Sequence, residues 1–191
     1  MQPLSTDEDY LPALLRDIAL LDSEATLVQL HAAAQQHAGD ARPLLLLAAE
    51  YAQARAYDQA EGAYISALRR DPGLAIARFQ LGLLQLSSGR PAAASATWAP
   101  LAALPEDNAL RRFKTGLEAL AEDRFADAAQ WLRAGMMVNH SNPMLNTDMQ
   151  RFLDAIARIG QTAAVTAETA SEAEEDADTS HFLVSAYTRL Q

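Results

Sequence analysis

The sequence predicts an all-α fold, a solenoid of stacked helix pairs, and three observations support this. The stretch from residue 41 to residue 143 repeats itself at a fixed spacing of 34 residues. Within it, apolar residues recur at steps of three and four, the period of one face of a helix. Half of the 191 residues are hydrophobic, with only eight glycines and eight prolines, which suits a helical domain with a core. Self-similarity at this period is typical of helix–turn–helix arrays.

Four columns of residues carry the repeat. They are Ala48, Gly82 and Gly116; Ala60, Ala94 and Ala128; Tyr57, Pro91 and Phe125; and Tyr64, Trp98 and Leu132. The first two columns hold small residues, which let neighbouring helices approach closely, and large side chains fill the space between them. Because no insertion breaks the period, we expect three units, at residues 41–74, 75–108 and 109–142.

A helical hairpin is expected ahead of the repeat, over residues 1–40. Ser5 and Glu8 form the pattern of a capping box in front of an amphipathic helix over 9–21. Asp22 or Ser23 caps a second helix, and Gly39 ends it. A degenerate repeat is the alternative interpretation of this hairpin.

Each unit of the repeat is expected to hold two helices. The expected helices are 41–54 and 57–70, then 75–88 and one that begins at Pro91, then 109–121 and 125–137. Pro100 lies inside the second helix of the middle unit and should kink or shorten it. A capping helix over 143–160 follows, with one apolar and one charged face, and Gly160 closes it.

These residues resemble the tetratricopeptide repeat family. In the first unit the matching positions are Leu44, Leu47, Ala48, Tyr51, Tyr57, Ala60, Tyr64, Ala67 and Pro72. The resemblance implies a right-handed solenoid that binds proteins, with a concave groove lined by the first helix of each unit. By the same resemblance, the groove would be lined by Leu45, Ala49, Ile76, Phe79, Leu83, Leu86, Leu110, Phe113, Leu117 and Leu120.

The expected groove is apolar, so its expected partner is a protein or peptide that presents an apolar helix. A large apolar surface should not face water. Two compatible interpretations follow: the chain fills the groove itself, or a partner's helix or apolar segment binds there.

The C-terminal residues supply a candidate occupant. Residues 161–180 contain six acids and neither lysine nor arginine, which predicts a flexible acidic linker whose alanines allow some helix. Residues 181–191 follow, and their apolar stripe at helical spacing is Phe182, Leu183, Ala186, Tyr187 and Leu190. We expect this segment to bind in the groove of its own chain or of a neighbour, the latter giving a homodimer.

Composition excludes several classes of function. The net charge of −10 argues against nucleic acid as a partner, since phosphate binding needs clustered cations. There is no cysteine, and His31 and His37 have no carboxylate four residues before or after them, so we expect neither a metal nor another cofactor. No catalytic motif is present. No run of eighteen apolar residues or signal-type leader occurs, so we expect no membrane span and a cytoplasmic location.

The sequence therefore predicts a non-enzymatic interaction module, a bacterial-type adaptor or assembly factor. Two alternatives stay open. One is a cytoplasmic chaperone of the secretion type that holds an exported protein, which the order of repeats and capping helix resembles. The other is a self-associating scaffold that dimerises through its C-terminal segment.

Overall fold

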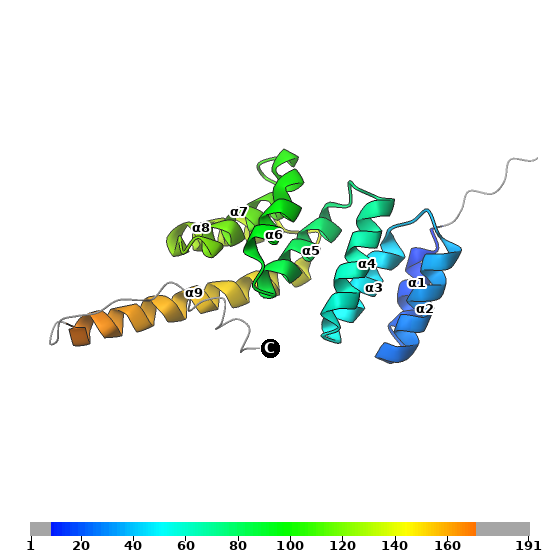
Figure 1. The fold of residues 1–191 in the computed structure, drawn as a ribbon, viewed down its shortest axis with the longest axis horizontal. Helices are drawn as coiled ribbons and strands as arrows, with labels where there is room; N and C mark the ends of the chain where they lie inside the picture. Colours follow the sequence, from blue (N-terminus) through cyan, green and yellow to red (C-terminus); the bar gives the residue numbers. More distant parts are fainter. Residues whose placement is uncertain (1–8, 171–191) are drawn as a thin grey trace, which may run out of the picture. The chain divides into compact units, whose positions relative to one another are not determined.

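The computed structural model describes residues 9–170, and for residues 162–170 it describes the backbone alone. Over that range the chain forms nine α-helices and one 3₁₀ helix with no strand, which confirms the all-α prediction (Figure 1). The helices fall into two compact units that divide between Ala77 and Arg78, within helix α5.

Unit 1 contains an N-terminal hairpin and the first predicted helix pair. Its helices are α1 (Leu11–Ile18), α2 (Ser23–Gln36), α3 (Arg42–Gln53) and α4 (Tyr57–Arg70), followed by the start of α5 (Ala75–Ser87). Helix α2 packs on α3, and α3 packs on α4. The side chain of Asp22 caps α2 by accepting a hydrogen bond from Ala25 N at 2.8 Å, as predicted. The predicted capping box at Ser5 and Glu8 lies outside the described residues.

Helix α1 is shorter than the predicted helix over 9–21. After Ile18 the backbone tightens, because Leu20 N bonds to Asp17 O at 3.3 Å and Leu21 N to Ile18 O at 3.1 Å. Such i to i+3 bonds are typical of the last turn of a helix. The chain therefore leaves the helix before Leu21.

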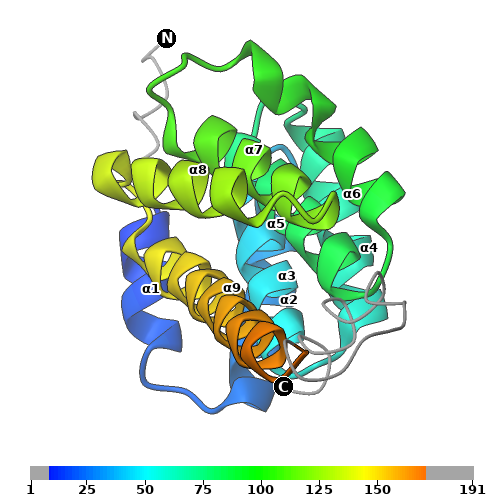
Figure 2. The ribbon, with the colours of Figure 1, turned by 90° about the vertical axis from the view of Figure 1, so that its left-hand side faces the viewer.

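Unit 2 contains the remaining helices, and α9 follows the last predicted pair. They are the rest of α5, α6 (Pro91–Trp98), the 3₁₀ helix η1 (Ala99–Ala103), α7 (Ala109–Ala121), α8 (Phe125–Val138) and α9 (Pro143–Ala170). The predicted effect of Pro100 is confirmed, because the α-helix ends at Trp98 and continues as η1. Figure 2 shows α8 against α7, and α9 packs on α8.

The turns inside the three helix pairs share one backbone conformation. Arg55, Gly89 and Asp123 have φ angles of 59°, 71° and 57°, in the left-handed region. In each turn the next residue donates its N–H to a carbonyl five residues back, at 2.9 Å. This 6→1 bond is typical of a helix end closed by a left-handed residue. The period of 34 residues thus extends from the side chains to the backbone.

The small-residue columns do allow close helix approach. Ala60, Ala94 and Ala128 are fully buried. A β-carbon at Gly116 would lie 2.9 Å from the Leu132 side chain, closer than an ordinary van der Waals contact. Gly116 therefore lets α7 and α8, the two helices of one pair, approach closely.

Helix α9 corrects the predicted boundary between capping helix and linker. It runs through Gly160 to Ala170, so the first half of the predicted 161–180 linker is helical. Glycine in a helix interior costs about 1 kcal/mol relative to alanine. The segment after Gly160 contains Gln161 and several alanines, which are good helix formers and offset that cost.

Candidate protein-binding surface

Phe79, on α5, is part of the core of unit 2. Its side chain is fully buried, with the ring of Trp98 stacked at 5.9 Å and the ring of Phe113 at 6.0 Å between centroids. Trp98 also donates its Nε1–H to the carbonyl oxygen of Phe79 at 2.9 Å. This buried hydrogen bond satisfies the polar atom of the indole. The three rings therefore join α5, α6 and α7.

Phe113 lies against the second helix of its own pair. A β-carbon at Gly135, on α8, would lie 2.5 Å from the Phe113 ring. The ring can occupy that space because glycine has no side chain there. Phe113 is consequently fully buried between helices of unit 2, and it is not available to a partner at the surface.

These contacts correct half of the predicted groove. Five of its ten residues are buried, namely Phe79, Leu86, Leu110, Phe113 and Leu117. The other five are half-buried, namely Leu45, Ala49, Ile76, Leu83 and Leu120. The predicted groove residues all lie on the first helices. One of the buried ones, Phe113, packs into the space that Gly135 leaves on the second helix of its pair. What stays accessible on the first helices is the half-buried set.

In unit 1 the half-buried residues lie on α3 and at the start of α5. Leu45 and Ala49 are one helical turn apart on α3, so they share a face. On the same helix Tyr51 hydrogen-bonds through its hydroxyl to His31 Nε2 at 2.8 Å. That bond joins α2 to α3, and Ser23 adds a second link between them by donating to Glu50.

Of the predicted groove residues in unit 2, Leu83 on α5 and Leu120 on α7 stay half-buried. The charged neighbours on α7 neutralise each other, because Lys114 Nζ lies 2.6 Å from Glu118 Oε2. Glu118 also accepts a hydrogen bond from Ser95 at 3.0 Å, which ties α6 to α7. On α7, the helix of Leu120, the charge of Lys114 is therefore paired with that of Glu118.

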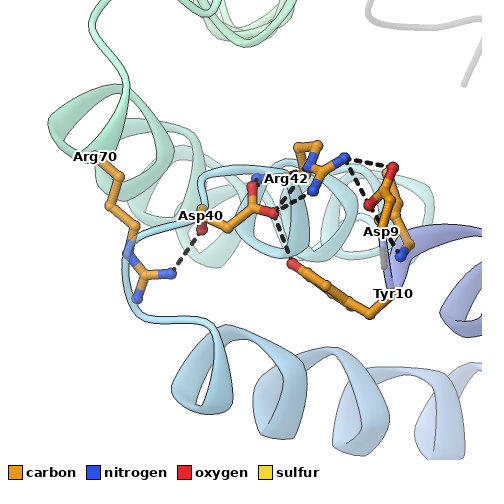
Figure 3. A network of polar contacts seen from close by, with 6 residues as sticks. Asp9, Tyr10, Asp40, Arg42 and Arg70 are labelled. Carbon is orange, nitrogen blue, oxygen red and sulfur yellow. Dashed lines mark hydrogen bonds and ion pairs between the residues drawn. The ribbon is translucent and has the colours of Figure 1, made fainter. Parts of the chain in front are cut away.

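A polar network at the N-terminal end of unit 1 was not predicted (Figure 3). Arg42 binds Asp40, with Nη2 at 2.7 Å from Oδ2, and Asp9, with Nη1 at 3.0 Å from Oδ1. Tyr10 donates its hydroxyl to Asp40 Oδ2 at 2.8 Å, and Arg70 donates to the Asp40 carbonyl oxygen at 3.0 Å. The network fastens the residues before α1 to the start of α3.

The network shifts the pKa values of its members. Hydrogen bonds from Arg42 lower the pKa of Asp40 to about 2, against the opposing effect of burial. Burial, followed by the hydrogen bond to Asp40, raises the pKa of Tyr10 to about 12. The Tyr10 ring also stacks on His37, with 3.4 Å between centroids and 2° between planes.

The sequence holds one local signal of this network. Asp40 stands two residues before Arg42, a spacing that suits a helix cap.

A polar hollow lies between the residues before α7 and the connection from α8 to α9. Its lining includes Asp107, Asn108, Asn139 and Asn142. Asn108 already caps α7 by accepting from Leu110 N at 2.9 Å. The buried Asn139 donates to Asn142 O at 2.6 Å and to Asn146 Oδ1 at 2.8 Å. These polar groups hold the fold together, which accounts for their presence.

Metal sites and membrane-spanning helices can be considered for the part of the chain that the structure describes. Within it, no three side chains of the metal-ligating acidic, histidine or cysteine types gather closely enough to hold a metal ion. None of the helices described between residues 9 and 170 combines the length and apolar character needed to cross a membrane. The predicted tail residues, namely Phe182, Leu183, Ala186, Tyr187 and Leu190, lie outside the described residues.

Comparisons with known proteins bear on the fold. No protein-family model matches the chain, and no curated protein matches it in sequence. Among solved structures, MamA 41-end from Desulfovibrio magneticus RS-1 is 14% identical, with a TM-score of 0.55 over 84% of this chain and 94% of that one. A structure described as the crystal structure of MamA protein is 15% identical, with a TM-score of 0.54 over 89% of this chain and 96% of that one. At these identities the likeness shows the fold, an all-α array of helix pairs of the tetratricopeptide type.

Proposed function

We propose that this chain is a non-enzymatic protein-interaction module, an adaptor or assembly factor, whose first helices bind an apolar helix of a partner protein. One observation carries the proposal: Leu83 on α5 and Leu120 on α7, both in unit 2, stay half-buried. Complete burial of a leucine side chain stabilises by about 1.5–3 kcal/mol. Each of these leucines can therefore gain free energy from a partner that covers it.

The surroundings favour an apolar partner over a charged one. On α7 the cation Lys114 is paired with Glu118 at 2.6 Å, so it does not offer a free charge to an acidic peptide. Helices bind in such places by inserting apolar side chains at steps of three and four residues.

The test uses a selected peptide as the probe, so the natural partner is not needed. Peptides are selected against the full chain from a library of amphipathic helices with randomised apolar positions. The dissociation constant of the best peptide is then measured for the full chain and for the variant Leu83→Glu. We expect the dissociation constant to rise at least tenfold, which corresponds to about 1.4 kcal/mol.

The matched control is Val28→Glu. Val28 is 66% exposed on α2, so the variant adds the same charge to an exposed apolar position that is not on a first helix. We expect this control to leave peptide binding within twofold of the unchanged chain. Equal losses in Leu83→Glu and Val28→Glu, with helical circular dichroism intact in both, would contradict the proposal.

A further inference from the structure

Helix α9 is too long for the helix it packs on. It has 28 residues, whereas α8 has 14. At 1.5 Å per residue these lengths correspond to about 42 Å and about 21 Å. Helix α8 therefore leaves about half of the length of α9 without a partner from that side, and Figure 1 shows α9 as one uninterrupted helix.

Along the apolar face of α9, the side chains near its start are buried and those further along are more exposed. Leu145, Met149 and Phe152 are buried, whereas Ile156 and Ile159 further along are only half-buried. After Ile159 the sequence repeats an apolar residue in steps of four, at positions 163 and 167, both alanine. The backbone is helical as far as Ala170, so these positions continue one face of the helix.

The C-terminal residues carry a complementary pattern. Phe182, Ala186 and Leu190 are also separated by steps of four. In an antiparallel pairing, these three positions fall opposite 167, 163 and 159 in that order. Phe182 then meets an alanine at one end, two alanines meet in the middle, and Leu190 meets the half-buried Ile159. This register therefore sets an apolar residue opposite an apolar residue at all three positions.

We propose that residues 182–190 fold back as a helix on the C-terminal half of α9 and so form a hairpin within one chain. The proposal stands independently of the proposed function. The connection, residues 171–180, is ten residues long, which gives a root-mean-square reach of about 16–19 Å. Packed helices need only 8–10 Å between axes. Ser180 stands two residues before Phe182, where a serine can cap a helix that begins at His181, and the acids of the connection favour a helix N-terminus.

The face of α9 suits this segment better than the predicted groove does. The groove positions Phe79, Phe113 and Leu117 are already buried. They offer the tail little further apolar area. The half-buried Ile156 and Ile159 of α9 are separated from residue 181 by a short stretch of chain, which makes pairing within one chain favourable.

Crosslinking tests the hairpin directly, because the chain contains no cysteine. The variant Ala163→Cys with Ala186→Cys is treated with a short bismaleimide, and mass spectrometry separates links within one chain from links between two. We expect rapid linkage within one chain. The matched control is Gln161→Cys with Ser185→Cys, which moves both thiols off the predicted contact, and we expect at least tenfold slower linkage.

Two results would overturn the inference. Links between two chains at the first pair would mean that a second copy covers α9. Equal linkage rates in the two pairs would mean that the tail does not dock in this register. As a second measurement, hydrogen exchange of residues 156–168 is compared between the full chain and the variant Phe182→Glu with Leu190→Glu. We expect exchange at least tenfold faster in the variant, and unchanged exchange there would also contradict the hairpin.

Discussion

The indole of Trp98 occupies the space where a side chain at position 82 would lie. A β-carbon on Gly82 would be 2.1 Å from Trp98 Nε1, and Trp98 is buried and hydrogen-bonded to the Phe79 carbonyl. The ring cannot move away without breaking that bond. This contact explains why position 82 of the repeated column is glycine.

We predict that Gly82→Ala lowers the free energy of unfolding by about 1–3 kcal/mol, because the added methyl overpacks the core. Gly62 on α4 provides the control, since it is exposed and has no atom within 4 Å of an added β-carbon. Gly62→Ala should raise the stability by about 0.5–1 kcal/mol. Urea denaturation followed by circular dichroism measures both. A stabilising effect of Gly82→Ala would show that the Trp98 contact is wrong.

The shared turn conformation gives a second prediction. Arg55 has a φ of 59°, and the corresponding residue of the next pair is Gly89. A residue other than glycine costs about 1–2 kcal/mol in this region, while glycine loses about 0.5–1 kcal/mol more entropy on folding. Arg55→Gly should therefore stabilise by about 0.5–1 kcal/mol.

The reverse change tests the same turn. Gly89→Ala should destabilise by about 1 kcal/mol, since alanine would be forced into the left-handed region. Thermal unfolding of both variants provides the comparison. If the two substitutions shift the midpoint in the same direction, the turns do not share this conformation.

These contacts show which parts of the fold could be predicted from the sequence. The columns at 34-residue spacing predicted the helix pairs, and the bounds of α4 and α7 agree with the prediction. The position of Pro100 predicted the end of α6. Such features depend on local spacing, which is present in one sequence.

Burial could not be predicted in the same way. Whether Phe113 is exposed depends on Gly135, 22 positions away on another helix, and nothing near Phe113 indicates that contact. The network at Asp40 likewise joins residues up to 33 positions apart. The extension of α9 could be predicted only in part, because the acids of residues 161–180 favour a linker while the alanines of this stretch allow some helix.

The network around Asp40 predicts a dependence of stability on pH. Its carboxyl has a pKa of about 2 in the folded chain, below the ordinary value of 3.8. The resulting stabilisation is complete above pH 3.8 and is lost as the pH falls towards 2. Asp40→Asn should remove this pH-dependent part of the free energy of unfolding. It amounts to about 1 kcal/mol, since the Arg42–Asp40 pair is partly exposed. The measurement is the free energy of unfolding between pH 6 and pH 3, and identical pH profiles would contradict it.

Tyr10 should titrate abnormally in the same network. Burial and its hydrogen bond to Asp40 raise its pKa from 10 to about 12. Its contribution to stability is complete below pH 10 and is lost as the pH rises towards 12. The pH titration of tyrosinate absorbance is measured for the unchanged chain and for Tyr10→Phe. The variant should lack one transition, and that transition should lie near pH 12. A missing transition near pH 10 would mean that the hydrogen bond to Asp40 does not form.

The central claim is that the half-buried residues of the first helices contact a bound helix. The most direct measurement places a photo-crosslinking amino acid at position 83, at position 120 or at the control position 28, and irradiates each full chain with the selected peptide. We predict peptide adducts from positions 83 and 120 and none above background from position 28. Adducts from position 28, with none from 83 or 120, would place the binding surface elsewhere and contradict the account.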